Sequence, residues 1–171
     1  GNEGAKQFCK QLVIQGDSLK LDDYWNDLTL PEIDLVITSP PYGPMLQKKG
    51  LVSKKREKEG LDTQYSKDKD DLGNAENYNQ FMDMLVEIFV KLKDKVKVGG
   101  HLVVVLQNYM HKGNYITLAW DFAIKMKEYY QLRGERIWCQ DNKTLFPYGY
   151  NYSFVPNVHH HYCLIFKRLE D

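Results

Sequence analysis

A run of apolar residues that ends in two consecutive prolines is the feature of this chain that most restricts its fold. Residues 33–37 are almost entirely apolar, and Thr-Ser-Pro-Pro-Tyr-Gly follows directly at residues 38–43. The apolar run predicts a strand that is buried on both faces. Pro40 and Pro41 each lack a backbone N–H and have a fixed φ, so they cannot extend that strand. The segment therefore predicts a stiff loop at the carboxyl end of a strand, the edge where open α/β sheets bind ligands.

Apolar spacing along the rest of the chain predicts alternating strands and helices, the pattern of an α/β sheet. The clearest helix runs from Tyr78 to about Val96, with Asn74 or Asn77 as its cap and Gly99-Gly100 as its stop. The further strands that we expect are at 12–15, 33–38, 101–106, 136–140 and 162–167, and the further helices at 21–30 and 115–131. A long polar loop covers residues 43–75, and loops of this length are typically functional or disordered. We expect one domain over residues 1–171.

The proline loop resembles motif IV, (Asp/Asn/Ser)-Pro-Pro-(Tyr/Phe), of enzymes that move a methyl group from S-adenosylmethionine to an exocyclic nitrogen. Thr-Ser-Pro-Pro-Tyr at residues 38–42 is most similar to DNA methyltransferases of the N4-cytosine and N6-adenine type, in the subgroup whose motif IV comes first. Three other segments resemble this family: a strand followed by Gly-Asp at 13–18, glycines before a strand at 98–105, and a final hairpin at 153–167. The resemblance covers nearly the whole chain.

This resemblance implies a Rossmann-like methyltransferase sheet and a set of site residues. The catalytic residues that it implies are Ser39, Pro40, Pro41 and Tyr42. The residues that it implies for binding S-adenosylmethionine are Asp17, Ser18 and Thr38, with Asp17 near the adenine. Asp17 followed by Ser18 equally suits a turn or the start of a helix, and both interpretations stay open.

The motif suits methylation of a planar amine. The lone pair of an exocyclic base nitrogen is conjugated into the ring, so the nitrogen is a weak nucleophile. The Ser39 hydroxyl and the Pro40 carbonyl can each accept an N–H, which favours a pyramidal nitrogen as charge develops in the transition state. Tyr42 can stack on the base, an interaction worth ~1–3 kcal/mol. A base in a duplex must be flipped out to reach such a loop.

The sequence contains no Phe-x-Gly-x-Gly segment, which in this family holds the methionine part of the cofactor. The resemblance therefore implies the catalytic half of an enzyme, with an incomplete domain. The family's strand order is 3-2-1-4-5-7-6, and strands 1 and 2 are missing here, so one edge of strand 4 is left open. Since exposed edges pair with other chains, we expect a second polypeptide, a second copy or a rearranged N-terminus to cover this edge. A monomer with this edge unpaired would contradict that expectation.

A basic stretch inside the long loop suggests DNA as a partner. Residues 48–58 contain six basic residues and one acid, whereas the whole chain has 23 of each kind. Basic side chains beside a base-flipping site would contact phosphates and supply affinity independent of base sequence. The candidate DNA-binding residues are Lys48, Lys49, Lys54, Lys55 and Arg56. The alternative is an ordinary solvated loop.

Other residues that suggest chemistry have simpler interpretations. Successive strand residues point to opposite faces, so His159, His160 and His161 cannot chelate one metal ion from one face, and we expect no metal site. The aromatic residues of 146–154 either wall a base pocket or cover an apolar edge. Three scattered cysteines predict neither zinc nor disulfides, and no long apolar run or signal peptide is present. We therefore expect a soluble, cytoplasmic protein.

Two other functions remain open. Relatives with Asn-Pro-Pro-Tyr methylate RNA guanine or protein glutamine, and Ser39 in place of Asn disfavours this assignment. A non-enzymatic function, as an inactive fragment or a DNA-binding module, is kept open by the absent Phe-x-Gly-x-Gly segment. The choice between cytosine and adenine is also open.

Overall fold

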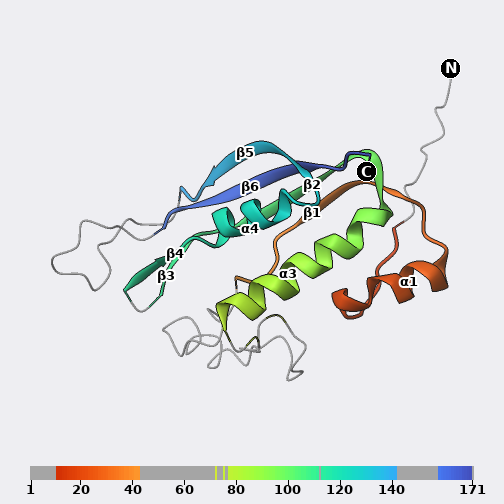
Figure 1. Ribbon diagram of the computed structural model, residues 1–171, viewed down its shortest axis with the longest axis horizontal. Helices are drawn as coiled ribbons and strands as arrows, with labels where there is room; N and C mark the ends of the chain where they lie inside the picture. Colours follow the sequence, from red (N-terminus) through yellow and green to blue (C-terminus); the bar gives the residue numbers. More distant parts are fainter. Residues whose placement is uncertain are drawn as a thin grey trace, which may run out of the picture.

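The chain forms an open α/β sheet in this computed structural model (Figure 1). The structure describes residues 11–42, 72, 75, 77–111, 113–141 and 158–170. The strand order of the main sheet is β1-β2-β6-β5. β1 (Ile33–Thr38) is parallel to β2 (Val96–Leu106), whereas β6 (His160–Lys167) is antiparallel to both β2 and β5 (Gln131–Cys139). β1 is therefore one edge of the sheet within the described residues.

The helices lie on one side of this sheet. Figure 1 shows α3 (Tyr78–Leu92) and α4 (Leu118–Met126) on the same side, with α1 (Leu21–Leu28) next to α3. α1 ends as predicted before Pro31, through Thr29 in a left-handed conformation with φ 49°. None of the helices in the described part of the chain has the length and hydrophobicity of a membrane span.

α3 forms where the sequence predicts it, because its apolar residues recur at three- and four-residue steps. The side chain of Asn77 caps the helix by accepting the N–H of Gln80 at 2.9 Å. Seven residues of α3 are buried, and all of them except Ile88 belong to the hydrophobic core: Phe81, Met82, Leu85, Val86, Ile88, Phe89 and Leu92. A short 3-10 turn (Lys93–Lys95) then leads into β2.

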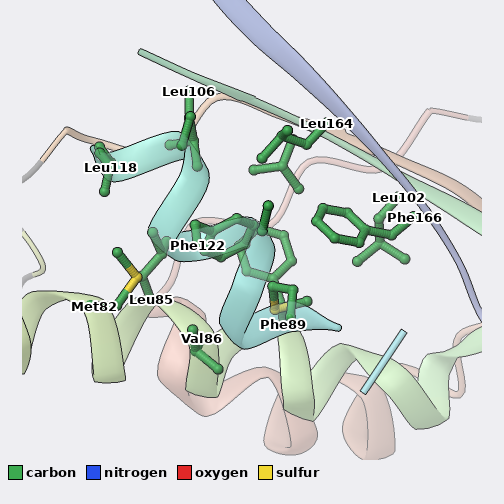
Figure 2. Packing of buried hydrophobic residues seen from close by; sticks show 14 of the residues in the cluster. Met82, Leu85, Val86, Phe89, Leu102, Leu106, Leu118, Phe122, Leu164 and Phe166 are labelled. Carbon is green, nitrogen blue, oxygen red and sulfur yellow. The ribbon is translucent and has the colours of Figure 1, made fainter. Parts of the chain in front are cut away.

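The core lies between the helices and one face of the sheet. Phe122 of α4 is fully buried at its centre, between Phe89 of α3 and Phe166 of β6 (Figure 2). The ring centroids of Phe122 are 5.2 Å from Phe89 and 6.1 Å from Phe166, both edge to face. Edge-to-face pairs of this kind add about 0.5–1.5 kcal/mol beyond the area that they bury.

The sequence predicts that Gly99 and Gly100 end α3. In the structure α3 ends earlier, and the two glycines lie inside β2. Val96 already belongs to the strand, and the pairing with β1 shifts register between Ile33 and Leu35. Gly99 has φ +83°, and a Cβ on Gly100 would collide with Val96 and the Lys97 carbonyl. The two glycines therefore form a bulge, a backbone irregularity that other residues fit poorly.

β1 is not buried on both faces, which corrects the expectation from its apolar sequence. Leu35 is 51% exposed and Ile37 is 67% exposed. Both point away from the helices, since Val36 between them pairs with the buried Leu102. No described element covers this second face of β1, whereas Val36 on the first face packs against the hydrophobic core.

The strand expected at residues 12–15 is absent, because residues 11–15 have no regular structure. Leu12 and Ile14 are exposed, and Val13 is 93% exposed. A strand needs a neighbour for its hydrogen bonds, and no described strand lies beside this segment. The described part of the N-terminal segment therefore does not extend the sheet past β1.

The region between β2 and β6 is divided differently from the sequence prediction. A hairpin of β3 (Tyr109–His111) and β4 (Asn114–Ile116) precedes α4, and β5 follows close behind it, so α4 is shorter at both ends than expected. Buried Asn108 helps to fix the start of α4, because its Oδ1 accepts the N–H of Ala119 at 2.8 Å.

Candidate active site

The proline loop leaves the sheet at the carboxyl end of its edge strand, as predicted. β1 ends at Thr38, and its last pair is with Val104 of β2. Ser39 is exposed, whereas Pro40, Pro41 and Tyr42 are half-buried. The four residues implied as catalytic therefore form one short loop with the serine outward.

Tyr42 links this loop to β6. Its hydroxyl lies 3.3 Å from Ser39 Oγ and 3.0 Å from Nδ1 of His161. Burial raises the pKa of Tyr42 above its ordinary value, and the hydrogen bond with Ser39 opposes this only in part. Tyr42 therefore remains a neutral phenol throughout the physiological range.

The neighbouring histidines of β6 point to opposite faces of the sheet, as strand geometry predicts. His161 is 8% exposed and stacks on Trp138 of β5, with ring centroids 5.1 Å apart and planes at 29°. His160 points to the opposite face, where its ring contacts Tyr162 at 4.9 Å. The contact of His161 with Tyr42 cannot be predicted from local sequence, because the two residues are 119 positions apart.

Asp17 caps the 3-10 turn (Ser18–Lys20) that precedes α1. Its Oδ1 accepts the N–H of Leu19 at 2.9 Å, so the helix-start interpretation of this residue is confirmed. Its own N–H donates to the Tyr24 hydroxyl at 3.0 Å. The cap fixes the position of the carboxylate but leaves open its expected function at a cofactor.

A small open hollow lies beside Asp17, with a volume of about 150 Å³. Its wall combines apolar and aromatic side chains with the polar atoms of residues 16–18. The residues that line it are Ile14, Gly16, Asp17, Ser18, Leu21, Tyr24, Trp25 and Leu30. Ligand pockets are typically ~300–1,000 Å³, so the hollow accommodates at most a ring-sized part of a larger ligand.

Thr38, the third residue expected on the cofactor side, is not among the residues that line this hollow. It pairs with Val104, which is fully buried, so the Thr38 side chain lies on the helix-covered face. The structure thus brings Asp17 and Ser18 together at one hollow and separates Thr38 from it. The expected DNA-binding residues at positions 48, 49 and 54–56, and the aromatic segment 146–154, lie outside the described residues.

A second polar cluster, which sequence analysis did not single out, joins α3 to α4. Asp121 Oδ2 accepts the Tyr78 hydroxyl at 2.6 Å and the Thr117 hydroxyl at 2.8 Å. Burial, followed by the neighbouring carboxylate, raises the pKa of Tyr78. These contacts fix the first turn of α4 against α3, so the cluster is structural.

Comparison with solved structures identifies the fold. The chain is similar to a candidate DNA modification methylase from Thermus thermophilus in complex with S-adenosyl-L-methionine, with 18% identity, a TM-score of 0.57 and 91% of this chain covered. It is also similar to the PvuII DNA methyltransferase, which is specific for cytosine N4, with 20% identity, a TM-score of 0.57 and 89% of this chain covered. The chain has a Rossmann-like methyltransferase fold. No family profile and no curated protein matches its sequence.

The likeness covers only part of these methyltransferases. The chain spans 54% of the Thermus thermophilus protein and 47% of the PvuII enzyme. This chain, with its open sheet, therefore corresponds to about half of each matched structure. The expectation of a partial methyltransferase sheet is confirmed.

Proposed function

We propose that this chain is the catalytic half of a DNA methyltransferase, which methylates an exocyclic amine, N4 of cytosine or N6 of adenine. The observation that carries the proposal is the Ser-Pro-Pro-Tyr loop at the carboxyl end of β1, in a sheet with the methyltransferase fold. The likeness to PvuII favours cytosine. By resemblance, a serine as the first residue of motif IV, such as Ser39, is also more typical of cytosine enzymes, whereas an aspartate is more typical of adenine enzymes.

The loop residues would act on the amine without a strong base. Ser39 Oγ and the Pro40 carbonyl would accept its two N–H groups and turn its lone pair out of the ring plane. Tyr42 would hold the flipped base by stacking. S-adenosylmethionine supplies the methyl on a sulfonium, whose sulfur keeps the bonding pair as the methyl leaves. The methylated nitrogen then carries a positive charge, so its proton is acidic enough to pass to solvent.

The hollow beside Asp17 fits one part of the cofactor. Trp25 and Leu21 offer apolar surface to a flat ring, and the Asp17 carboxylate can accept a hydrogen bond from a ring amine. Adenine has both features. At about 150 Å³ the hollow does not enclose the sugar and methionine parts as well, so further residues must bind them.

A second polypeptide is the partner that we propose for these missing contacts. No described strand pairs with the outer edge of β1, so its backbone groups can pair with another segment, and Leu35 and Ile37 expose apolar surface beside this edge. The matched methyltransferases are about twice as long as this chain, which favours a segment carrying the other half of the fold. A second copy of this chain is the alternative occupant. DNA is the proposed substrate, with the basic residues of 48–58 on its phosphates.

The test measures transfer of a labelled methyl group from S-adenosylmethionine to duplex DNA, with RNA and a glutamine peptide as competitors. We expect transfer to DNA when the chain is joined to a polypeptide that carries a Phe-x-Gly-x-Gly segment, and weak or no cofactor binding by calorimetry for the chain alone. Ser39→Ala combined with Tyr42→Ala should abolish transfer, whereas Asn79→Ala, an exposed change on α3, should not. Full transfer by the double variant would refute the assignment of the loop.

A further inference from the structure

Three side chains form a hydrogen-bonded series that begins at the exposed serine. Ser39 Oγ contacts Tyr42 Oη at 3.3 Å, and Tyr42 Oη contacts His161 Nδ1 at 3.0 Å. Ser39 and Tyr42 belong to the proline loop, whereas His161 belongs to β6. The loop is therefore joined to the sheet through the imidazole.

His161 is held firmly by its surroundings. It lies directly opposite Trp138 in the β5–β6 pairing, and the two rings stack. Only 8% of its surface is exposed. The Tyr42 ring also contacts it, with centroids 5.9 Å apart and planes tilted by 41°. A ring fixed by stacking and burial can fix the orientation of its hydrogen-bond partner.

The acidities of the three groups indicate which of them donates each hydrogen bond of the series. A phenol is a stronger donor than a serine hydroxyl, and an unprotonated imidazole nitrogen is a stronger acceptor than either oxygen. Because burial raises the pKa of Tyr42, its proton is always present to be donated. Tyr42 then donates to Nδ1, and the Ser39 hydroxyl donates to Tyr42 Oη. Both lone pairs of Ser39 Oγ remain for an incoming amine.

We propose that His161 is a positioning residue, a neutral imidazole with its proton on Nε2, which orients Tyr42 and makes Ser39 a hydrogen-bond acceptor. The use of that acceptor rests on the proposed function, because an exocyclic amine offers N–H donors and a conjugated lone pair. If the series ran the other way, Tyr42 would donate to Ser39. The serine proton would then point outward and meet the amine as a competing donor.

The direct test is nitrogen NMR of the 171-residue chain with ¹⁵N-labelled histidine, at a pH about 1.5 units above the ordinary imidazole pKa of ~6.5. The His161→Phe spectrum assigns the signal. We expect an unprotonated Nδ1 and a protonated Nε2, and a shift of the Nδ1 resonance in Tyr42→Phe. A proton on Nδ1, or no response to Tyr42→Phe, would overturn the proposal whatever reaction the protein catalyses.

Kinetics of the completed methyltransferase give the second readout. His161→Phe keeps a ring to stack on Trp138 but removes the acceptor, so kcat should fall about tenfold, the effect of losing one hydrogen bond. The matched control is His160→Phe, since the His160 ring points to the other face and contacts Tyr162. Equal kcat values for the two variants would overturn the positioning assignment. Absence of methyl transfer in the wild type would instead contradict the proposed function, and the NMR result would still decide the tautomer.

Discussion

At the residue scale, the environment rather than the residue type decides what a side chain does here. Tyr42 is one of 12 tyrosines, and its place in the proline loop and its contacts with Ser39 and His161 distinguish it. The motif could be predicted because its residues are contiguous in sequence. The contact with His161 could not, because it depends on how β6 is placed beside β2.

Gly16 shows the same dependence on surroundings. A Cβ at this position would overlap the ring and hydroxyl of Tyr24. We expect Gly16→Ala to displace that ring and break its hydrogen bond with the Asp17 N–H, which lowers the free energy of unfolding by about 1 kcal/mol. Urea unfolding measures this cost. In a Tyr24→Ala background the same change should cost almost nothing, and an unchanged cost there would contradict the explanation.

The burial of Tyr130 leads us to expect that the free energy of unfolding falls at alkaline pH. Its hydroxyl is buried and donates to the Phe89 carbonyl at 2.9 Å, and burial raises its pKa. Above its unfolded pKa of ~10, the unfolded chain releases this proton while the folded chain keeps it, so stability falls as pH rises. The urea midpoint should therefore be lower at pH 11 than at pH 8. The drop should be smaller in Tyr130→Phe, and an equal drop would exclude this residue as its source.

At the element scale, local sequence predicted the helices better than the strands. The apolar stripe of α3 lies within the helix, and its cap is the residue directly before it, Asn77. Both can therefore be predicted from neighbouring residues without knowledge of the tertiary structure. Gly99 and Gly100 were misassigned, because glycines end helices and also form bulges. Only the pairing of β2 with β1 distinguishes these two uses.

The cap of α3 gives the prediction at this scale. Asn77→Ala removes the acceptor of the Gln80 N–H and should lower the free energy of unfolding by about 1 kcal/mol. The control, Asn79→Ala, changes an exposed position within the helix and should be neutral or slightly stabilising. Chemical denaturation compares the two variants, and equal effects would show that the cap contributes nothing.

At the scale of the whole molecule, the main feature is the asymmetry of the sheet. The helices cover one face, while Leu35 and Ile37 remain exposed on the other, on β1, which is the edge strand among those that the structure describes. Exposed apolar surface beside an unpaired strand favours association. The exposed face and the unpaired edge both belong to β1, because the described elements that follow this strand pack against the other face of the sheet.

We therefore expect the isolated chain to self-associate as its concentration rises. Leu35→Lys combined with Ile37→Lys should reduce this association while changing the free energy of unfolding by less than about 1 kcal/mol, since both residues are more than half exposed. Light scattering measures the association. Ile124→Lys, at a 68% exposed position on α4, is the matched control and should leave it unchanged. An equal effect of both changes would indicate general solubility rather than a specific surface.

Local sequence is enough to specify what depends on neighbouring residues: the strand–loop unit from Ile33 to Tyr42, the stripe and cap of α3, and the α/β class. Tertiary structure alone decided which face of β1 is covered, that residues 11–15 form no strand, and that His161 reaches Tyr42. The apolar run predicts burial on two faces, but burial requires a partner on each face, and a strand requires a neighbour for its hydrogen bonds. Such partners come from distant parts of the chain or from another molecule, and local sequence does not specify them.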